Sequence, residues 1–281
     1  MEAVARHDRP QTELRTTRYD DAAGLHFDVD HGIGLITIDR PATRNAISPE
    51  IMSGLAAVLD RIDSRADIGV VGVRGAGDRA FVSGGDLKSL AEIRSFEGAT
   101  NMACTMRGVL DRLASLPMPT VALLNGDAFG GGAELAVACD MRVAADDVKI
   151  GFTQTRLGVM PGWGGIERLT SLVGRARAGY LLATGDTLSA SDARSLGLIE
   201  MVHPRAEFEQ QARGVLNKIA AIPAGPRLAI KHIVSTVAPA CSPDTSAAAI
   251  ESFAQSWIAD EHWAMADEAD RQRRTRHASD T

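Results

Sequence analysis

Short apolar runs that end in glycine-rich turns recur along the N-terminal part of this chain. The run Ile68–Val73 ends at Gly75-Ala76-Gly77, and the run Thr120–Leu124 ends at Asn125-Gly126. Unbroken apolar runs of this length are typical of strands buried on both faces, as in parallel sheets. Parallel neighbours need long crossover connections, and helical stretches separate these runs. The pattern therefore predicts an α/β fold with a mostly parallel sheet.

Other elements are predicted before the first of these runs. Leu25–Asp30 and Ile33–Asp39 are strand-like and meet at His31-Gly32, which predicts a β-hairpin. Ser48-Pro49 is a helix-start signal, because serine caps the first turn and proline fits inside it. Residues 1–20 are polar and aperiodic, which predicts a loose N-terminal extension.

Helical periodicity dominates from Gly165 to the C-terminus. We expect an α/β core over residues 21–200 and a helical C-terminal region over residues 201–281. The stretch Ala238–Pro243 is expected to link the last helices to the rest. The helices predicted along the chain after the first are Asn101–Leu116, Ile166–Leu172, Arg175–Thr184, Ala190–Leu196, Ala206–Ile222, Pro226–Val237 and Ser246–Ala259, and a polar helical stretch is expected to end near Ser95.

Composition excludes several classes of function. A net charge of −6 argues against a nucleic-acid partner, whose binding needs a basic face. No apolar run is long enough to span a membrane, and the first twenty residues do not resemble a signal peptide. Cys104, Cys139 and Cys241 are far apart, so neither a zinc site nor a disulfide framework is expected. These features predict a cytoplasmic protein without a metal.

The segment around Gly130-Gly131-Gly132 carries the clearest chemical signal. A strand leads into these three glycines, and a helix with Glu134 in its first turn follows. Glycines let a ligand approach the backbone closely, and a helix N-terminus offers free N–H groups that favour negative charge. This arrangement suits a developing oxyanion. The alternative is a turn that only packs the helix against the strand.

A second glycine turn, Ser83-Gly84-Gly85-Asp86, also follows a strand-like run, Phe81-Val82. Taken alone, it is more simply a plain turn. Two such turns after successive strands of one sheet can present two N–H donors to one oxygen. The sequence therefore predicts an oxyanion hole built from both turns.

Five ordered motifs resemble the crotonase superfamily, the enoyl-CoA hydratase/isomerase fold, from about Leu25 to Ala238. The resemblance implies a spiral of ββα units with a helical C-terminal trimerisation region, and hence a homotrimer or homohexamer. The motifs are Arg40-Pro41 with Arg44-Asn45-Ala46, Phe81 with Ser83–Leu87, Asn125–Asp140, Leu157–Leu169, and Thr184-Gly185 through Ile199.

The resemblance also implies roles for individual residues. The backbone N–H groups of Gly85 and Gly131 would form the oxyanion hole for the carbonyl of an acyl-CoA thioester. Coenzyme A would belong to the substrate rather than to a permanent cofactor, and no metal is expected. The residues placed around the substrate are Ser83, Gly84, Asp86, Lys88, Gly130, Pro161 and Trp163. Lys88 could instead lie on a solvated helix face, and Trp163 could instead fill the core.

The choice of reaction depends on two positions. In the hydratases two glutamates hold the attacking water; one aligns with Glu134, whereas the other aligns with Gln154. A glutamine can orient water but cannot take a proton at neutral pH. Hydration by Glu134 together with Gln154 is the main prediction. The isomerases are disfavoured, because their key carboxylate is the missing one.

Two alternatives stay open. The local strings Val148–Phe152, Gly162–Gly165 and Asn101–Cys104 resemble ethylmalonyl-CoA decarboxylase, which needs the oxyanion hole and one acid but no base. Some members of the superfamily are non-catalytic scaffolds or RNA-associated proteins, and the acidic charge and intact glycine turns weigh against that reading.

Overall fold

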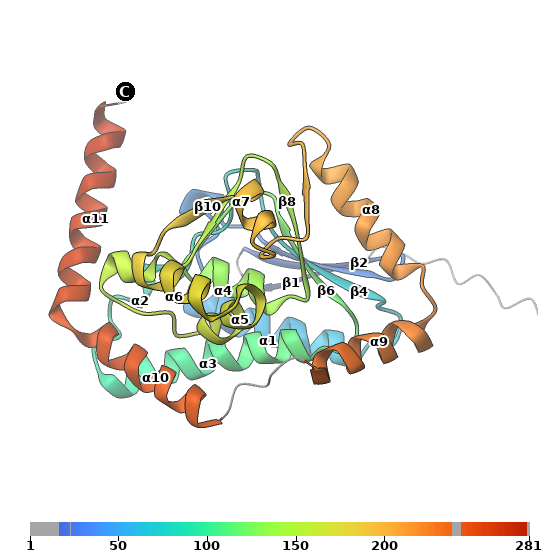
Figure 1. Ribbon diagram of the computed structural model, residues 1–281, viewed down its shortest axis with the longest axis horizontal. Coiled ribbons are helices and arrows are strands. Elements are labelled where there is room, and N and C mark those ends of the chain that lie inside the picture. Colours follow the sequence, from blue (N-terminus) through green and yellow to red (C-terminus); the bar gives the residue numbers. More distant parts are fainter. Residues whose placement is uncertain (1–16, 23, 238–242, 280–281) are drawn as a thin grey trace, which may run out of the picture.

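The computed structural model describes residues 17–22, 24–237 and 243–279 of the chain. Their strands form two sheets, and helices pack around them (Figure 1). The core lies between the larger sheet and α1 (Pro49–Asp63), α3 (Phe96–Ser115) and α4 (Gly131–Ala138), and it is made mainly of Leu, Ile, Val and Ala. The α/β class predicted from the apolar runs is confirmed.

The larger sheet has seven strands in the order β1-β2-β3-β4-β6-β8-β11. Strands β1 to β3 pair antiparallel, whereas β3, β4, β6, β8 and β11 pair parallel. All five residues of β6 are buried, as the unbroken apolar run predicts. The strands are β1 (Thr17–Ala22), β2 (Leu25–Asp30), β3 (Ile33–Ile38), β4 (Val70–Gly75), β6 (Thr120–Leu124), β8 (Met141–Ala145) and β11 (Met201–His203).

The predicted hairpin is confirmed and joins β2 to β3. His31 and Gly32 have φ angles of 48° and 77°, the two positive values that a tight hairpin turn requires. Burial alternates along β2, with Leu25, Phe27 and Val29 facing the core.

The smaller sheet has four strands in the order β10-β9-β7-β5. Strands β5, β7 and β9 are parallel, and each follows a strand of the larger sheet, which produces the expected spiral of ββα units. The bounds are β5 (Ala80–Val82), β7 (Asp127–Phe129), β9 (Lys149–Gly151) and β10 (Thr187–Ser189). Asp127 follows the Asn125-Gly126 turn and begins β7, because its backbone pairs with Ala80 of β5.

Local capping explains where the helices before the site begin. Ser48 caps α1 by accepting a hydrogen bond from Ile51 N–H, as predicted. The prediction that a helix begins at Asn101 is wrong. Ser95 accepts a hydrogen bond from Gly98 N–H at 3.0 Å and starts α3 at Phe96. The polar stretch before it forms only the short α2 (Leu87–Leu90).

The helices predicted after the site segments occur in the predicted order. The short 3-10 helix η1 (Pro41–Thr43) precedes α1, and η2 (Thr153–Leu157) follows β9. The later helices are α5 (Gly165–Val173), α6 (Arg175–Thr184), α7 (Ala190–Ser195), α8 (Phe208–Ala220), α9 (Ala224–Val237), α10 (Pro243–Ile258) and α11 (Asp260–Ser279). Helix α10 packs along α3, whereas most of α11 projects from one end of the molecule (Figure 1). None of the described helices is both long and apolar enough to cross a membrane.

A strand of the larger sheet lies at each of the two expected boundaries. Residues 17–20 of the predicted extension belong to β1, and residues 1–16 lie outside the described part of the chain. The boundary after residue 200 falls just before β11, which completes the larger sheet, and α8 then packs on that sheet. Most of the predicted linker, residues 238–242, also lies outside the described residues.

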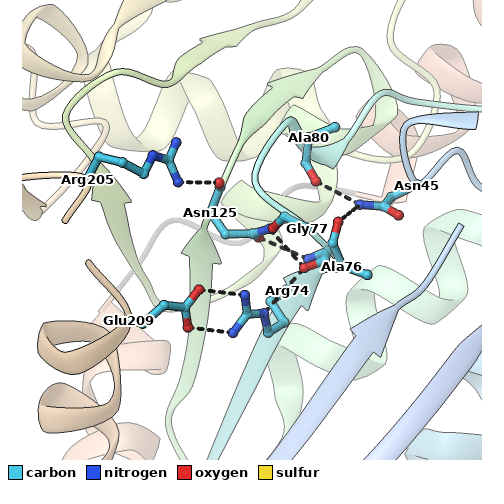
Figure 2. A network of polar contacts seen from close by, with 9 residues as sticks. Asn45, Arg74, Ala76, Gly77, Ala80, Asn125, Arg205 and Glu209 are labelled. Carbon is cyan, nitrogen blue, oxygen red and sulfur yellow. Dashed lines mark hydrogen bonds and ion pairs between the residues drawn. The ribbon is translucent and has the colours of Figure 1, made fainter. Parts of the chain in front are cut away.

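Two buried asparagines hold the loop that leads into the smaller sheet (Figure 2). Asn125 Nδ2 donates to the carbonyls of Gly75 at 2.8 Å and Gly77 at 2.6 Å, and its Oδ1 accepts from Gly75 N–H at 3.1 Å. Asn45 Nδ2 donates to the carbonyl of Ala80 at 2.7 Å. Because this loop runs directly into β5, these bonds also fix the start of the strand that leads to the glycine turn 83–86.

Candidate active site

The two glycine turns meet at one edge of the smaller sheet. The turn 83–86 follows β5 and the turn 130–132 follows β7, and these strands are parallel neighbours. A Cβ atom on Gly84 would lie 3.3 Å from the backbone nitrogen of Gly131. Gly84 has φ 108° and Gly130 has φ 56°, conformations that other residues rarely adopt. Glycine at these positions lets the two backbones touch.

Backbone pairing orients the N–H groups of both turns. Ile47 N–H donates to the Gly84 carbonyl at 2.8 Å, and Asp86 N–H donates to the Ile47 carbonyl at 2.9 Å. In such a parallel bridge the N–H of the intervening residue, Gly85, points away from Ile47. Gly131 is the first residue of α4, so its N–H has no acceptor within the helix. Among the described residues neither N–H has a hydrogen-bond acceptor, so both are available donors, and the dipole of α4 favours negative charge at Gly131.

The indole ring of Trp163 lies against both turns. A Cβ atom on Gly131 would be 2.1 Å from its Cζ3, and one on Gly85 would be 3.7 Å from its Cη2. Trp163 is only 5% exposed. The sequence left open whether Trp163 lines the site or fills the core, and the structure places its ring at the two turns.

Glu134 lies in the first turn of α4 and is 2% exposed. Its Oε1 accepts hydrogen bonds from the backbone N–H groups of Trp163 at 2.8 Å and Gly165 at 2.9 Å. Its Oε2 accepts from Nε2 of Gln154 at 2.9 Å. A Cβ atom on Gly165 would lie 2.4 Å from Cγ of Glu134, so only glycine lets α5 begin against this carboxylate.

Burial raises the pKa of Glu134 to about 7. The hydrogen bonds from Gly165, Trp163 and Gln154 and the positive charge of Arg168 act in the opposite direction and keep the pKa from rising further. A carboxylate that titrates near neutral pH can take or give a proton in a reaction, which is the property required of a general acid or base.

Gln154 lies in η2 and contacts Oε2 of Glu134, whereas the N–H groups of Trp163 and Gly165 contact Oε1. Its Oε1 is buried and has no hydrogen-bond partner among the described residues. Leaving a buried acceptor unpaired costs free energy, so this oxygen favours a ligand with a hydrogen to donate, such as a water molecule. The pair therefore combines one titrating group with one fixed acceptor.

Four other residues, Ser83, Asp86, Lys88 and Pro161, were predicted to contact the substrate. Asp86 is 9% exposed; it accepts a hydrogen bond from Arg40 at 2.9 Å and caps α2. Burial alone would raise the pKa of Asp86, but the hydrogen bonds from Arg40 and Ser89 lower it below its ordinary value. The Ser83 hydroxyl donates to a backbone carbonyl at 3.3 Å. Lys88 is exposed and Pro161 is buried, and contacts of all four with a substrate stay predictions.

Arg168 is a site residue that sequence reasoning did not identify. Its Nη1 donates to the Trp163 carbonyl at 3.0 Å, and its Nη2 forms an ion pair with Asp111 of α3. Glu167, in the first turn of α5, pairs with Arg107 at 2.8 Å. Both ion pairs join residues far apart in the chain, so no local pattern indicates them. Among the described residues, no group of His, Cys, Asp and Glu could hold a metal ion.

Comparisons with known proteins identify the family of the chain. The model of the family "Enoyl-CoA hydratase/isomerase" matches residues 28–265. A Mycobacterium bovis protein named "Probable enoyl-CoA hydratase" is 34% identical over 206 residues, which cover 73% of this chain and 79% of that protein. The crystal structure of enoyl-CoA hydratase from Bacillus anthracis has a TM-score of 0.73 and 34% identity, and the match covers 76% of this chain and 83% of that one.

A further solved structure shows the fold alone. An enoyl-CoA hydratase from Mycobacterium avium subsp. paratuberculosis has a TM-score of 0.81 at 24% identity, with 89% of this chain and 100% of that chain covered. The match of the family model and the identity to the relatives establish the assignment. The chain belongs to the enoyl-CoA hydratase/isomerase family.

Proposed function

We propose that the protein is an enoyl-CoA hydratase, which adds water across the double bond of a trans-2-enoyl-CoA. The observation that carries this proposal is the Glu134–Gln154 pair, buried beside the two available N–H groups of Gly85 and Gly131. Coenzyme A enters and leaves as part of the substrate and product and is not a resident cofactor.

The two N–H groups bind the thioester carbonyl oxygen. When water adds to the β-carbon, negative charge moves onto this oxygen and an enolate forms. Donors that are fixed before the reaction stabilise this charge, and removal of one such donor costs about 3 kcal/mol in other enzymes. The N-terminus of α4 adds its dipole on the same side.

One carboxylate can complete the proton transfers. The attacking water donates one hydrogen bond to Oε1 of Gln154 and the other to the Glu134 carboxylate. Glu134 takes this second proton as the C–O bond forms at the β-carbon, and it then returns the proton to the α-carbon of the enolate. Water is consumed, a 3-hydroxyacyl-CoA is formed, and Glu134 returns to its carboxylate form. A pKa near 7 suits both steps.

A second candidate is the decarboxylation of an alkylmalonyl-CoA. The observation that favours it is the single titrating carboxylate, with an amide where hydratases have their second glutamate. Loss of CO2 generates the enolate without a base, and protonated Glu134 would then supply the proton to the α-carbon. This reaction needs Glu134 in its acid form, whereas hydration begins with the carboxylate form.

A mass-spectrometric screen distinguishes the candidates. Purified protein is incubated separately with crotonyl-CoA, methylmalonyl-CoA and ethylmalonyl-CoA, with the Glu134→Gln variant as the matched control. Hydration adds one water to crotonyl-CoA, whereas decarboxylation removes one CO2 from the malonyl thioesters. Gain of water that depends on Glu134 supports the main proposal; loss of CO2 alone would replace it with the second candidate.

We also propose that copies of the chain associate through α9, as a trimer or hexamer. The buried Lys231 fixes this helix to the core through an ion pair with Asp140 and a bond to the Ala114 carbonyl at 2.9 Å. Its opposite side is apolar and exposed in the single chain, which is typical of an interface. The exposed fractions are 61% for Ile230, 59% for Ile233, 63% for Val234 and 78% for Val237, spaced as on one helix face.

Analytical ultracentrifugation tests this association. The wild type is expected to sediment as a trimer or hexamer, and Ile233→Asp is expected to dissociate it because the aspartate would bring a charge into the interface. His232→Asp, on the exposed polar side of α9, is the control. A monomeric wild type contradicts the proposal.

The proposed location is the cytoplasm. Cys104 and Cys139 are free thiols, as expected in a reducing compartment. Fractionation of cells that express the full chain tests this directly, and recovery from an oxidising compartment would contradict it.

A further inference from the structure

Trp163 lies between Glu134 and the two glycine turns, 83–86 and 130–132. Its backbone N–H is bonded to Glu134 at 2.8 Å and its carbonyl accepts from Arg168 at 3.0 Å. Both bonds hold the main chain, and the indole itself is held by burial, since Trp163 is only 5% exposed. The benzo half of the ring lies against Gly131 and Gly85.

We propose that the Trp163 indole limits the length of the acyl group and that the substrates carry short acyl chains. This inference rests on the proposed binding of an acyl thioester at Gly85 and Gly131. A carbonyl oxygen held by these two N–H groups places the next carbons of the acyl group beside the ring that touches both glycines.

The packing around the ring explains why a long chain would not fit there. Trp163 is 5% exposed, and a Cβ atom on Gly85 would be 3.0 Å from Cδ1 of Leu90 as well as 3.7 Å from the indole. Leu90 itself is 1% exposed. Space beside Gly85 is therefore filled by two large buried side chains, of which the tryptophan buries the greater area. A longer acyl chain would have to displace one of them, and displacement of a buried aromatic ring is costly.

Replacement of the indole should therefore change the preference for chain length. The kcat/KM of the wild type is measured for crotonyl-CoA, trans-2-octenoyl-CoA and trans-2-dodecenoyl-CoA and is expected to fall with length. In Trp163→Ala the ratio of the dodecenoyl to the crotonyl value should rise by about tenfold or more, since single methylenes in a filled pocket already change selectivity by that order. An unchanged ratio overturns the proposal.

A loss of stability alone would not produce this change. Phe208→Leu is the matched control, because Phe208 is a fully buried aromatic residue on α8, which packs on the larger sheet. This variant is expected to lower Tm and to leave the ratio as in the wild type. If Trp163→Ala does not fold, Trp163→Phe replaces it, because this variant keeps a ring in the core and removes the outer part of the indole. The ratio of the dodecenoyl to the crotonyl kcat/KM should then rise in the same way, by a smaller factor.

Binding measurements separate this inference from the proposed reaction. Calorimetric titration with butyryl-CoA, octanoyl-CoA and dodecanoyl-CoA needs no turnover. The wild type should bind butyryl-CoA more tightly than dodecanoyl-CoA, and Trp163→Ala should reduce or reverse this preference. That result supports the inference even if crotonyl-CoA is not hydrated. Equal binding of all three by the wild type, or a preference that survives the substitution, contradicts it.

Discussion

Nε2 of Gln154 lies 2.9 Å from Oε2 of Glu134, and this hydrogen bond joins the carboxylate of the site to an amide whose own oxygen has no partner among the described residues. A second glutamate at position 154 would bring two negative charges into contact, and one of them would take a proton. The amide avoids this coupling. It holds Glu134 in place and still offers an acceptor for water.

Removal of this amide should therefore weaken catalysis in two ways. Gln154→Leu loses the acceptor for water and the bond to Glu134, and the loss of about 2 kcal/mol corresponds to roughly a 30-fold decrease in kcat/KM for crotonyl-CoA. The pKa of Glu134 should also rise, because this bond lowers it. Steady-state kinetics across pH test both effects, with Gln210→Leu on the surface of α8 as the control. Wild-type kinetics in Gln154→Leu would remove Gln154 from the mechanism.

The burial of Glu134 should make stability depend on pH. Its pKa of about 7 lies above the ordinary 4.5, so the native state keeps a proton that the unfolded chain has released. The contribution of this group to the free energy of unfolding is complete below pH 4.5 and is lost as pH rises through 7, by about 3 kcal/mol.

Glu134→Gln removes this dependence, because glutamine does not ionise. The variant is expected to melt at a higher temperature than the wild type at about pH 8 and at nearly the same temperature at about pH 5. Differential scanning calorimetry at both pH values measures the difference. A gap in Tm that is the same at both would show that Glu134 is not held near neutral pKa.

A side chain at Gly131 should disturb the indole before it reaches the substrate. From the sequence alone, a side chain here would be expected to block the thioester; the structure shows that Cβ would first lie 2.1 Å from Cζ3 of Trp163. Gly131→Ala is therefore expected to lower both Tm and kcat/KM. Gly131→Ala combined with Trp163→Ala should recover part of the lost Tm, because the collision is removed and the two effects are not additive.

The control for this pair is Gly108→Ala. Gly108 lies within α3, and a Cβ atom there would meet nothing within 4 Å. This substitution should keep or raise Tm, since alanine favours the helix by about 0.5–1 kcal/mol. Strictly additive losses in the Gly131–Trp163 double variant would contradict the packing described.

Arg168 should set the pH at which Glu134 acts. Its charge lowers the pKa of Glu134, and its guanidinium holds the Trp163 carbonyl and pairs with Asp111. In Arg168→Met the pKa of Glu134 should rise, so the acid limb of the pH profile of kcat/KM should move to higher pH. Part of the lost activity should return at alkaline pH. Arg107→Met, which breaks the neighbouring pair with Glu167, should lower Tm without moving the limb. An acid limb that stays in place would assign Arg168 a structural role only.

Much of this architecture could be predicted because its signals are local. The hairpin at His31-Gly32, the cap at Ser48 and the two glycine turns each depend on residues adjacent in sequence, and each is present. The start of α3 was misplaced, because Ser95 as a capping residue lies before the periodic apolar stripe begins. Strand β7 was missed because it is only three residues long and is defined by its neighbours.

The chemistry of the site was predicted less completely than its position. Glu134 and Gln154 were identified through the resemblance to the hydratases, but the raised pKa of Glu134 depends on its burial in the assembled fold. The contact of Trp163 with Gly131 joins residues 32 positions apart, and the Arg168–Asp111 pair joins residues 57 positions apart. Such contacts follow from the assembled fold and leave no signature in the local sequence.

The pH dependence of kcat/KM for crotonyl-CoA tests the central claim most directly. If the Glu134 carboxylate accepts the proton of the attacking water, kcat/KM should rise with pH to a plateau with an apparent pKa near 7, and Glu134→Gln should show a much lower value without this limb. A rate that instead falls as pH rises through 7, or a Glu134→Gln variant with wild-type turnover, would contradict the account.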